Sequence, residues 1–142
     1  GASELPVWSS ANVSGIDISS FCHKCSDNCA ENTFEQIFED VRDSAYRIIN
    51  AKGSTYYAIA EAVRRIAEAI VRDERAILPV STLLEGQYGI NGICMGVPCI
   101  VGKNGIEEIL EIPLNESEKN QLLRSASTLH STLGNLGIAL TV

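Results

Sequence analysis

The residues best placed to contact a small ligand lie in the stretch Asn50-Ala-Lys-Gly-Ser-Thr-Tyr-Tyr-Ala-Ile59, between two amphipathic segments. It sets the hydroxyl of Thr55 one helical turn before the branched apolar side chain of Ile59. Because positions i and i+4 share one face of a helix, the two side chains can contact the polar and the flat parts of one small molecule. Periodicity alone favours a plainer interpretation, in which Thr55 bonds nearby backbone and Ile59 belongs to the core.

Cysteine and histidine provide a second candidate site, in the pattern Cys22-x-x-Cys25-x-x-x-Cys29 with His23. A structural zinc site needs four thiolate or imidazole ligands around the metal, and no second cluster completes this one. Ordinary loop cysteines are therefore the favoured interpretation, with zinc as the alternative. A nucleophilic pair of Cys25 with His130 lacks an activating context, and His130 is more simply a helix residue.

Carboxylates offer a third possibility, since Glu107, Glu108 and Glu111 could form an acid–base pair. Adjacent strand residues point to opposite faces of a sheet, so Glu107 and Glu108 are not expected to act together. Cys94 and Cys99 lie in an apolar run and are expected to be small core residues. We therefore expect no catalytic or metal-binding group in the chain.

Composition limits the class of protein. The chain has 142 residues, enough for one domain over residues 1–142 with its own core. Its formal charge is −7, with 18 acidic against 11 basic residues, which argues against nucleic acid and anionic membranes as partners. No apolar run approaches about 20 residues, so no membrane span is expected. No basic segment followed by an apolar run is visible, so a signal peptide is not expected in this sequence. Five cysteines without a secretion signal favour reduced thiols and a cytoplasmic location.

Apolar residues at spacings of three and four predict three helices, each with one buried stripe. The first begins near residue 32 or 33 and is ended by Gly53, and the second runs from an N-cap at Ser54 to about Asp73. The third opens with the capping-box variant Asn115-Glu-Ser-Glu118. The predicted buried positions are Phe34, Ile37, Phe38, Val41, Ala45, Ile48 and Ile49, then Ile59, Val63, Ile66 and Ile70, then Leu122, Ala126, Leu129, Leu133 and Leu136. Glu61 with Arg65, and Arg64 with Glu68, are expected to pair on the exposed side.

The remaining segments predict strands and loops. A short strand is expected at Val7 to Val13, followed by a loop to residue 20, with a surface loop at 22–33. Three apolar runs joined by short turns predict an antiparallel meander, at 76–84, 93–101 and 106–112. Pro79 and Pro98 each lack an N–H and are expected at strand edges or bulges. The expected fold class is α+β, in the order strand, two helices, three-stranded meander, helix.

Several motifs in a fixed order carry a family resemblance. They are Ser3-Glu-Leu-Pro-Val-Trp-Ser9, Phe38-Glu-Asp-Val-Arg-Asp-Ser-Ala-Tyr46, Lys52-Gly-Ser-Thr-Tyr-Tyr-Ala-Ile59, Tyr88-Gly-Ile-Asn-Gly92, Val97-Pro-Cys-Ile-Val-Gly-Lys-Asn-Gly-Ile106 and Ser125-Ala126. Together they resemble the C-terminal, substrate-side domain of NAD-dependent L-lactate dehydrogenases, in the lactate/malate dehydrogenase family. The resemblance runs nearly from end to end.

The resemblance implies hydride transfer between a nicotinamide cofactor and the C2 carbon of a 2-hydroxy acid. It implies that Thr55 lines the substrate pocket and that Ile59 packs on the nicotinamide of NAD, with Ala45 as a further wall. Tyr46 matches a tyrosine that is modified in some relatives. Malate dehydrogenases tend to carry Gly-Ser-Ala-Tyr-Tyr-Ala-Pro where this chain has threonine and isoleucine. That difference favours lactate and pyruvate, with malate or another 2-hydroxy acid as the alternative.

The chain also departs from the family pattern. It starts just after the place of the catalytic histidine, Ala2 stands where the family has aspartate, and the dinucleotide-binding half is missing. We therefore expect an inactive fragment that binds NAD weakly or not at all, from a parent enzyme that is a homotetramer. Its partners would be its own N-terminal domain and other copies of the chain. The rival interpretation is a non-catalytic oligomerisation module, and the mass of the native protein would separate the two.

Overall fold

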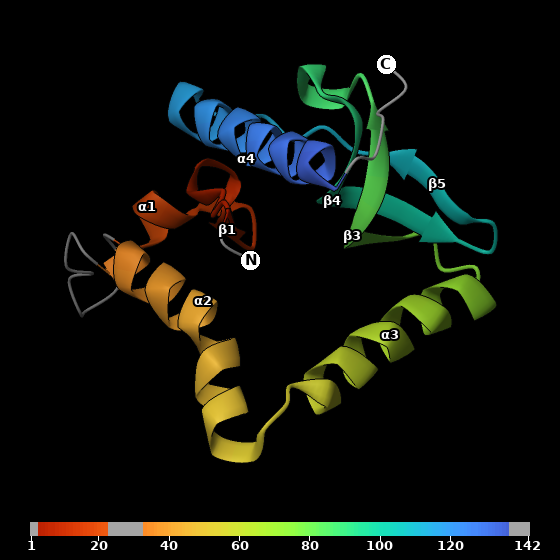
Figure 1. Cartoon of the computed structure of the whole chain (residues 1–142), viewed down its shortest axis with the longest axis horizontal. Helices are drawn as coiled ribbons and strands as arrows, with labels where there is room; N and C mark the ends of the chain where they lie inside the picture. The colour runs from red at the N-terminus through yellow and green to blue at the C-terminus, as the bar shows by residue number, and fades with distance from the viewer. Residues whose placement is uncertain (1–2, 23–32, 137–142) are drawn as a thin grey trace.

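The computed structural model describes residues 3–22 and 33–136 and has the expected α+β class (Figure 1). Two helices extend away from a three-stranded sheet, and a third helix lies against that sheet. The elements in chain order are η1 (Trp8–Ser10), β1 (Asn12–Val13), β2 (Ile16–Asp17), α1 (Ile18–Cys22), α2 (Thr33–Lys52), α3 (Tyr56–Val71), β3 (Ala76–Glu85), η2 (Gln87–Gly89), β4 (Asn91–Gly102), β5 (Gly105–Ile109) and α4 (Glu116–Asn135).

The sheet is an antiparallel meander in the order β3-β4-β5, which confirms the prediction. Alternate residues of a strand point to opposite faces, and here one face is buried. Helix α4 packs on that face, and Ala69 near the end of α3 joins the same core. The buried apolar residues are Ala69, Leu84, Ile90, Ile93, Met95, Val97, Cys99, Val101, Leu122 and Ala126.

The prolines and cysteines of the sheet follow its geometry. Pro79 lies on the edge strand β3 as expected, but Pro98 lies opposite it in the central strand β4, away from both register shifts. The carbonyl of Pro98 accepts a hydrogen bond from the Leu110 N–H at 2.8 Å, so the position without an N–H faces β5 rather than β3.

Cys99 is buried as predicted, and burial raises the pKa of its thiol. Cys94 is exposed because it points to the opposite face, so its assignment to the core was wrong.

The strand predicted at residues 7–13 and the loop after it are not formed. A 3₁₀ turn at Trp8–Ser10 leads into a hairpin of two-residue strands, Asn12–Val13 and Ile16–Asp17, and then into α1. Ser14 and Gly15 both have positive φ, as a tight two-residue turn requires. Asp17 caps α1 by accepting from the Ser19 N–H at 2.9 Å. The polar side chains of this segment thus decide its local structure.

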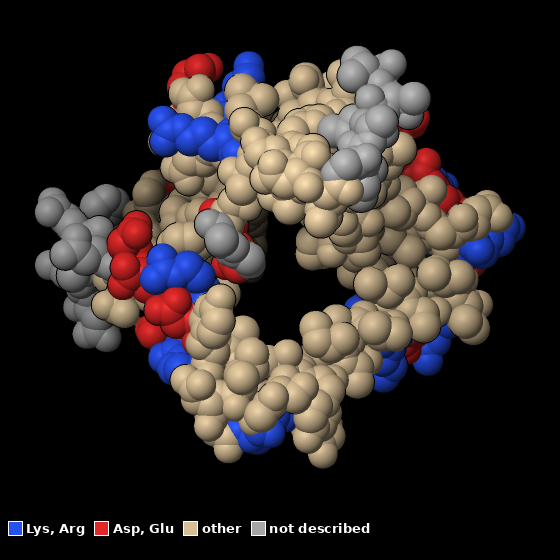
Figure 2. All heavy atoms as spheres, viewed as in Figure 1, with Lys and Arg blue, Asp and Glu red and all other residues tan. Residues whose placement is uncertain are grey.

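Helices α2 and α3 form an arm, the α2–α3 arm (residues 33–71), that extends away from the sheet and bends at Gly53 (Figure 1). No residue of α2 is buried, so the predicted burial of its stripe was wrong. In α3 only Ala69 is buried, while Val63 is 60% exposed. Figure 2 shows an opening in the molecule, bordered mainly by uncharged residues, between this arm and the rest.

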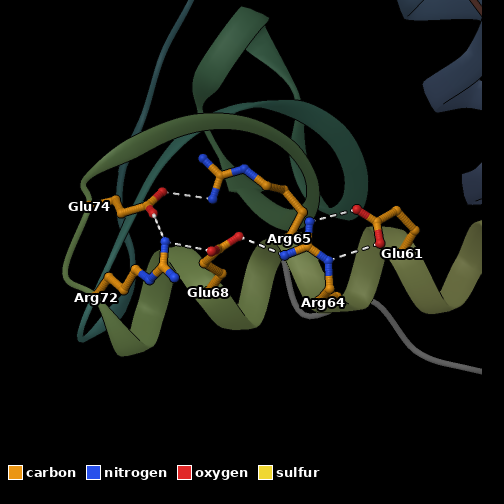
Figure 3. A network of polar contacts seen from close by, with 6 residues as sticks. All are labelled: Glu61, Arg64, Arg65, Glu68, Arg72 and Glu74. Carbon is orange, nitrogen blue, oxygen red and sulfur yellow. Dashed lines mark hydrogen bonds and ion pairs between the residues drawn. The ribbon is translucent and has the colours of Figure 1, made fainter.

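Ion pairs follow the exposed side of α3 (Figure 3). Arg64 joins Glu61 at 2.7 Å and Glu68 at 2.8 Å, which confirms the predicted pair with Glu68. Arg65 pairs with Glu74 at 2.7 Å beyond the end of the helix, so its predicted pair with Glu61 was wrong. Arg72 adds a further bridge to Glu68. The network ties α3 to the loop that enters β3.

The capping box of α4 is confirmed, because Asn115 accepts from the Glu118 N–H and Glu118 accepts from the Asn115 N–H, both at 2.9 Å. The predicted stripe faces the sheet from Leu122 to Leu133, but Leu136 lies past the end of the helix and is 69% exposed. In residues 3–22 and 33–136, no helix is both long enough and apolar enough to cross a membrane.

Candidate functional site

A small cavity of about 300 Å³ lies where α2 meets α3. It contains the hydroxyl-bearing Thr55 together with one charged side chain and mainly apolar walls. Its lining residues are Ile48, Ala51, Lys52, Thr55, Tyr57 and Ala58. The junction that the sequence pointed to is therefore a hollow that a small molecule can enter.

The backbone of the junction sets Thr55 in place. Gly53 adopts φ +84° and donates its N–H to Ile49 at 2.7 Å, which ends α2 in the left-handed conformation that glycine permits. Helix α3 begins at Tyr56, and its N-cap is Thr55 rather than the predicted Ser54. The Thr55 side chain makes no capping hydrogen bond, so capping does not occupy its hydroxyl. That hydroxyl can both donate and accept a hydrogen bond.

Ile59 lies one turn further along α3 but outside the cavity. Its N–H points back to the Thr55 carbonyl at 3.5 Å, and its side chain is 60% exposed. The structure thus brings the two residues to the same end of one helix without placing them in one hollow. Thr55 is one of the residues that line the cavity, while Ile59 offers an exposed apolar surface one turn further along α3. Their roles in binding substrate and cofactor stay a prediction.

Lys52 and Tyr57 are cavity residues that sequence reasoning missed. The Lys52 Nζ lies 4.1 Å from the ring centroid of Tyr57 and 4.9 Å from that of Tyr56, which are cation–π distances. The signal was present, since Ile48, Ala51 and Lys52 are three and four residues apart and share one helix face. Thr55 and Lys52 are thus the lining residues with an aliphatic hydroxyl and a charge close to an otherwise mainly apolar wall, and the Lys52 ammonium contacts the two tyrosine rings.

A larger hollow of about 1000 Å³ lies between the N-terminal segment, α2, the sheet and α4. Trp8, Ile37, Phe38 and Val41 line it, facing Pro79 and Gly96 of the sheet and Leu122 of α4. Its lining is mostly apolar, so it offers surface for packing rather than groups for acid–base chemistry.

Two of the candidate glutamates, Glu107 and Glu111, have structural partners. Glu107 pairs with Arg75 at 3.0 Å, and Glu111 accepts from the Tyr88 N–H at 2.8 Å. Ala45 and Tyr46 are exposed on α2 and do not line the Thr55 cavity.

The alternative metal and nucleophile sites, which the sequence did not favour, fall largely outside the described part of the chain. His23, Cys25 and Cys29 lie outside the described residues, as does the side chain of Cys22. Within the residues that are described, no three histidine, cysteine or acidic side chains are grouped to hold a metal. The pairing of Cys25 with His130 is therefore untested, and His130 is a half-buried helix residue.

Comparison with known proteins gives a consistent family. Residues 1–136 match the lactate/malate dehydrogenase family, alpha/beta C-terminal domain. L-lactate dehydrogenase 1 of Clostridium acetobutylicum is 50% identical over 136 residues, which is 96% of this chain and 44% of that protein. An L-lactate dehydrogenase of Acetivibrio thermocellus is 50% identical over 141 residues, 97% of this chain and 44% of its own length.

Solved structures agree with the sequence matches. The minor L-lactate dehydrogenase of Enterococcus mundtii, in its ligands-bound form, aligns with a TM-score of 0.87 at 38% identity, over 95% of this chain and 43% of that one. MGS-M5, a lactate dehydrogenase from a Medee basin deep-sea metagenome library, aligns with a TM-score of 0.92 at 38% identity, over 96% of this chain and 44% of its own. The chain thus spans less than half of each of these proteins.

Proposed function

Because this chain belongs to the lactate/malate dehydrogenase family, in its alpha/beta C-terminal domain, we propose that it supplies the substrate side of an L-lactate dehydrogenase. The proposed enzyme interconverts L-lactate and pyruvate with NAD. The names of the relatives support this activity, and those relatives extend well beyond the region that this chain matches. The activity is accordingly proposed for a protein that contains this chain together with a dinucleotide-binding domain.

The observation that carries the proposal is the position of Thr55, in the cavity at the α2–α3 junction with its hydroxyl unused by capping. By resemblance, Thr55 and Ile59 are the two positions of this stretch at which the chain differs from malate dehydrogenases, which tend to carry Gly-Ser-Ala-Tyr-Tyr-Ala-Pro there. A hydroxyl here can hydrogen-bond the polar end of a small 2-oxo acid, which an alanine cannot do. The alternative of malate is therefore less favoured.

The residues of this chain would bind and orient the substrate and NAD, and would not transfer protons. Thr55 would hydrogen-bond the substrate, and the exposed side chain of Ile59 fits a role against the flat ring of NAD. NAD supplies the hydride chemistry when it is bound, and protein groups position the substrate. The described residues that line the cavity include no carboxylate or histidine. The proposal therefore assigns proton transfer to the dinucleotide-binding side of the enzyme.

The exposed apolar faces of the α2–α3 arm support a proposal about partners. Val41 is 63% exposed and Val63 is 60% exposed, and extensive exposed apolar surface marks a protein interface. We assign it to the enzyme's own N-terminal domain and to other copies of the chain in a homotetramer. A cytoplasmic location follows from the resemblance.

A chimera tests the proposal. The chain is joined to the N-terminal part of the Clostridium acetobutylicum relative, and NADH oxidation is measured with pyruvate and with oxaloacetate. We expect turnover of pyruvate in preference to oxaloacetate. Thr55→Ala should raise the KM for pyruvate about tenfold, the effect of one lost hydrogen bond of about 1.4 kcal/mol. Thr132→Ala, which removes an exposed threonine hydroxyl from α4, is the matched control.

Three outcomes would contradict parts of the proposal. Preference for oxaloacetate would assign the chain to malate instead. An unchanged KM in Thr55→Ala would remove Thr55 from the substrate site. Lactate-dependent NADH formation by the chain alone would refute its dependence on a dinucleotide-binding domain.

A further inference from the structure

Glu118 is a buried carboxylate that the proposed reaction does not use. It lies in the first turn of α4 and is 5% exposed. Its Oε1 accepts from the Ser9 N–H at 3.0 Å, and its Oε2 accepts from the Ser9 hydroxyl at 2.5 Å and from the Asn115 N–H at 2.9 Å. A charge is tolerated away from water only when such donors satisfy it. The side chain therefore does more than close a capping box.

Ser9 connects this carboxylate to a distant part of the chain. It stands 109 residues from Glu118, in the short η1 helix beside Trp8. The ring of Trp8 packs on Phe34 at the start of α2, with 5.0 Å between the ring centroids. The Ser10 hydroxyl adds a bond to the Pro113 carbonyl at 3.0 Å. Contacts thus run from α4 through η1 to α2.

We propose that Glu118 is a positioning residue, which holds Ser9 and, through Trp8 and Phe34, fixes the place of α2 relative to the sheet. Helix α2 ends at the cavity that contains Thr55, so the consequence for substrate binding rests on the proposed function. The positioning itself does not. Glutamine could not replace the carboxylate fully, because its NH₂ group is a donor and would face a backbone N–H in either orientation, that of Ser9 or that of Asn115.

Acid should release this contact. Burial opposes the charged form of Glu118, but the hydrogen bonds from Ser9 and Asn115 outweigh it and lower the pKa below its ordinary value of 4.5. The contact is therefore fully formed above that value and is lost as pH falls through the lowered pKa. Neither η1 nor residues 112–115 carry an ionisable side chain, and on α4 the flanking charges are the exposed Glu116 and Lys119. Protonation of Glu118 itself is the expected trigger.

Trp8 is the single tryptophan of the chain and lies next to Ser9, so its fluorescence reports the contact. Acrylamide quenching of Trp8 is followed from about pH 7 to pH 3, with far-UV circular dichroism in parallel. We expect quenching to rise about twofold with a midpoint below 4.5, before helical ellipticity is lost. Glu118→Gln should show the high quenching already at neutral pH, with no acid transition. Glu116→Gln, two residues earlier and exposed, is the matched control and should behave like the wild type.

Hydrogen exchange tests the link to α2 directly. In Glu118→Gln at neutral pH, peptides from α2 should exchange severalfold faster than in the wild type, while peptides from β4 should not change. Ser9→Ala removes the hydroxyl but keeps the backbone N–H donor, so exchange of α2 peptides should rise by an intermediate amount. This variant provides the test if Glu118→Gln fails to fold. Wild-type quenching with a retained acid transition in Glu118→Gln would overturn the proposal. Unchanged hydrogen exchange of α2 in Glu118→Gln would also overturn it. The same holds if Trp8 quenching and helical ellipticity of the wild type change in one shared acid transition. None of these measurements needs lactate or NAD, so they stand apart from the chimera test.

Discussion

The sheet with α4 and the α2–α3 arm both have regularly spaced apolar residues, alternating along the strands and at spacings of three and four along the helices, but the two regions differ in burial. In the first region, Ile93 of β4 is 1% exposed and Leu122 of α4 is 8% exposed. In the arm, Ile59 and Val63 occupy equivalent stripe positions and are each 60% exposed. An apolar stripe therefore specifies which face of a helix can be buried, while the elements around it decide whether that face is buried.

The arm is held at its two ends and not at its middle. Ala69 is fully buried against the sheet near the end of α3, and Phe34 contacts Trp8 near the start of α2. Between them, the Thr55 cavity lies at the bend at Gly53 and is lined mostly by exposed residues. Exposed ion pairs along α3 add little stability of their own. This arrangement suits a wall whose other side is provided by another part of the protein.

The sharpest test of the comparison is one substitution made in both regions. Ile93→Ala removes a buried side chain and should lower the free energy of unfolding by about 2–5 kcal/mol. Ile59→Ala removes an exposed one and should change it by less than about 0.5 kcal/mol in the chain alone. Urea denaturation followed by circular dichroism measures both. Equal losses would mean that the stripe of α3 is buried in solution, which would remove the contrast.

A smaller effect distinguishes the two helix N-termini. Asn115 caps α4 with its side chain, so Asn115→Ala should cost about 1 kcal/mol of stability. Thr55 stands at the N-cap of α3 without a capping bond, so Thr55→Ala should leave the stability of the chain almost unchanged. Thermal unfolding of the two variants compares them. A cost for Thr55→Ala as large as that for Asn115→Ala would show that its hydroxyl caps the helix and is not free for a ligand.

The smallest expected effect concerns the ion pairs of the arm. Arg64→Ala breaks the bridges to Glu61 and Glu68, which lie on the exposed side of α3. It should lower the unfolding temperature slightly at low salt, and the difference should disappear at about 1 M NaCl because salt screens exposed charges. Arg124→Ala on the exposed side of α4 serves as the control. A large, salt-independent loss would mean that the network holds the arm in place.

Much of the fold was predictable because long periodic segments dominate it. The spacing of apolar residues placed α2, α3 and α4, and the turns between apolar runs placed the meander. The segment from Trp8 to Cys22 could not be predicted in this way, because two-residue strands and a 3₁₀ turn contain no repeat of any period. A proline is tolerated at position 98 of the central strand because of the neighbouring strand that its missing N–H faces. The pairing of the strands determines that direction, and the local sequence does not reveal it.

The site was only partly predictable. The spacing of Thr55 and Ile59 indicated the junction, and Gly53 predicted the break between the helices. The cavity takes its walls from both helices, however, and the sequence does not give the angle at which they meet. The pattern of Asn115 and Glu118 predicted the capping box, yet nothing local to Glu118 indicated its bonds to Ser9. Such contacts join residues that are distant in sequence, so only the folded structure reveals them.

Hydrogen exchange of the chain alone and of the chimera tests most directly the claim that the arm is a wall completed by another part of the protein. We predict that β4 amides are protected equally in both proteins, while amides in the middle of the arm, around Thr55, gain protection only in the chimera. Equal protection of the arm in both proteins would show that it needs no further partner and would contradict the account.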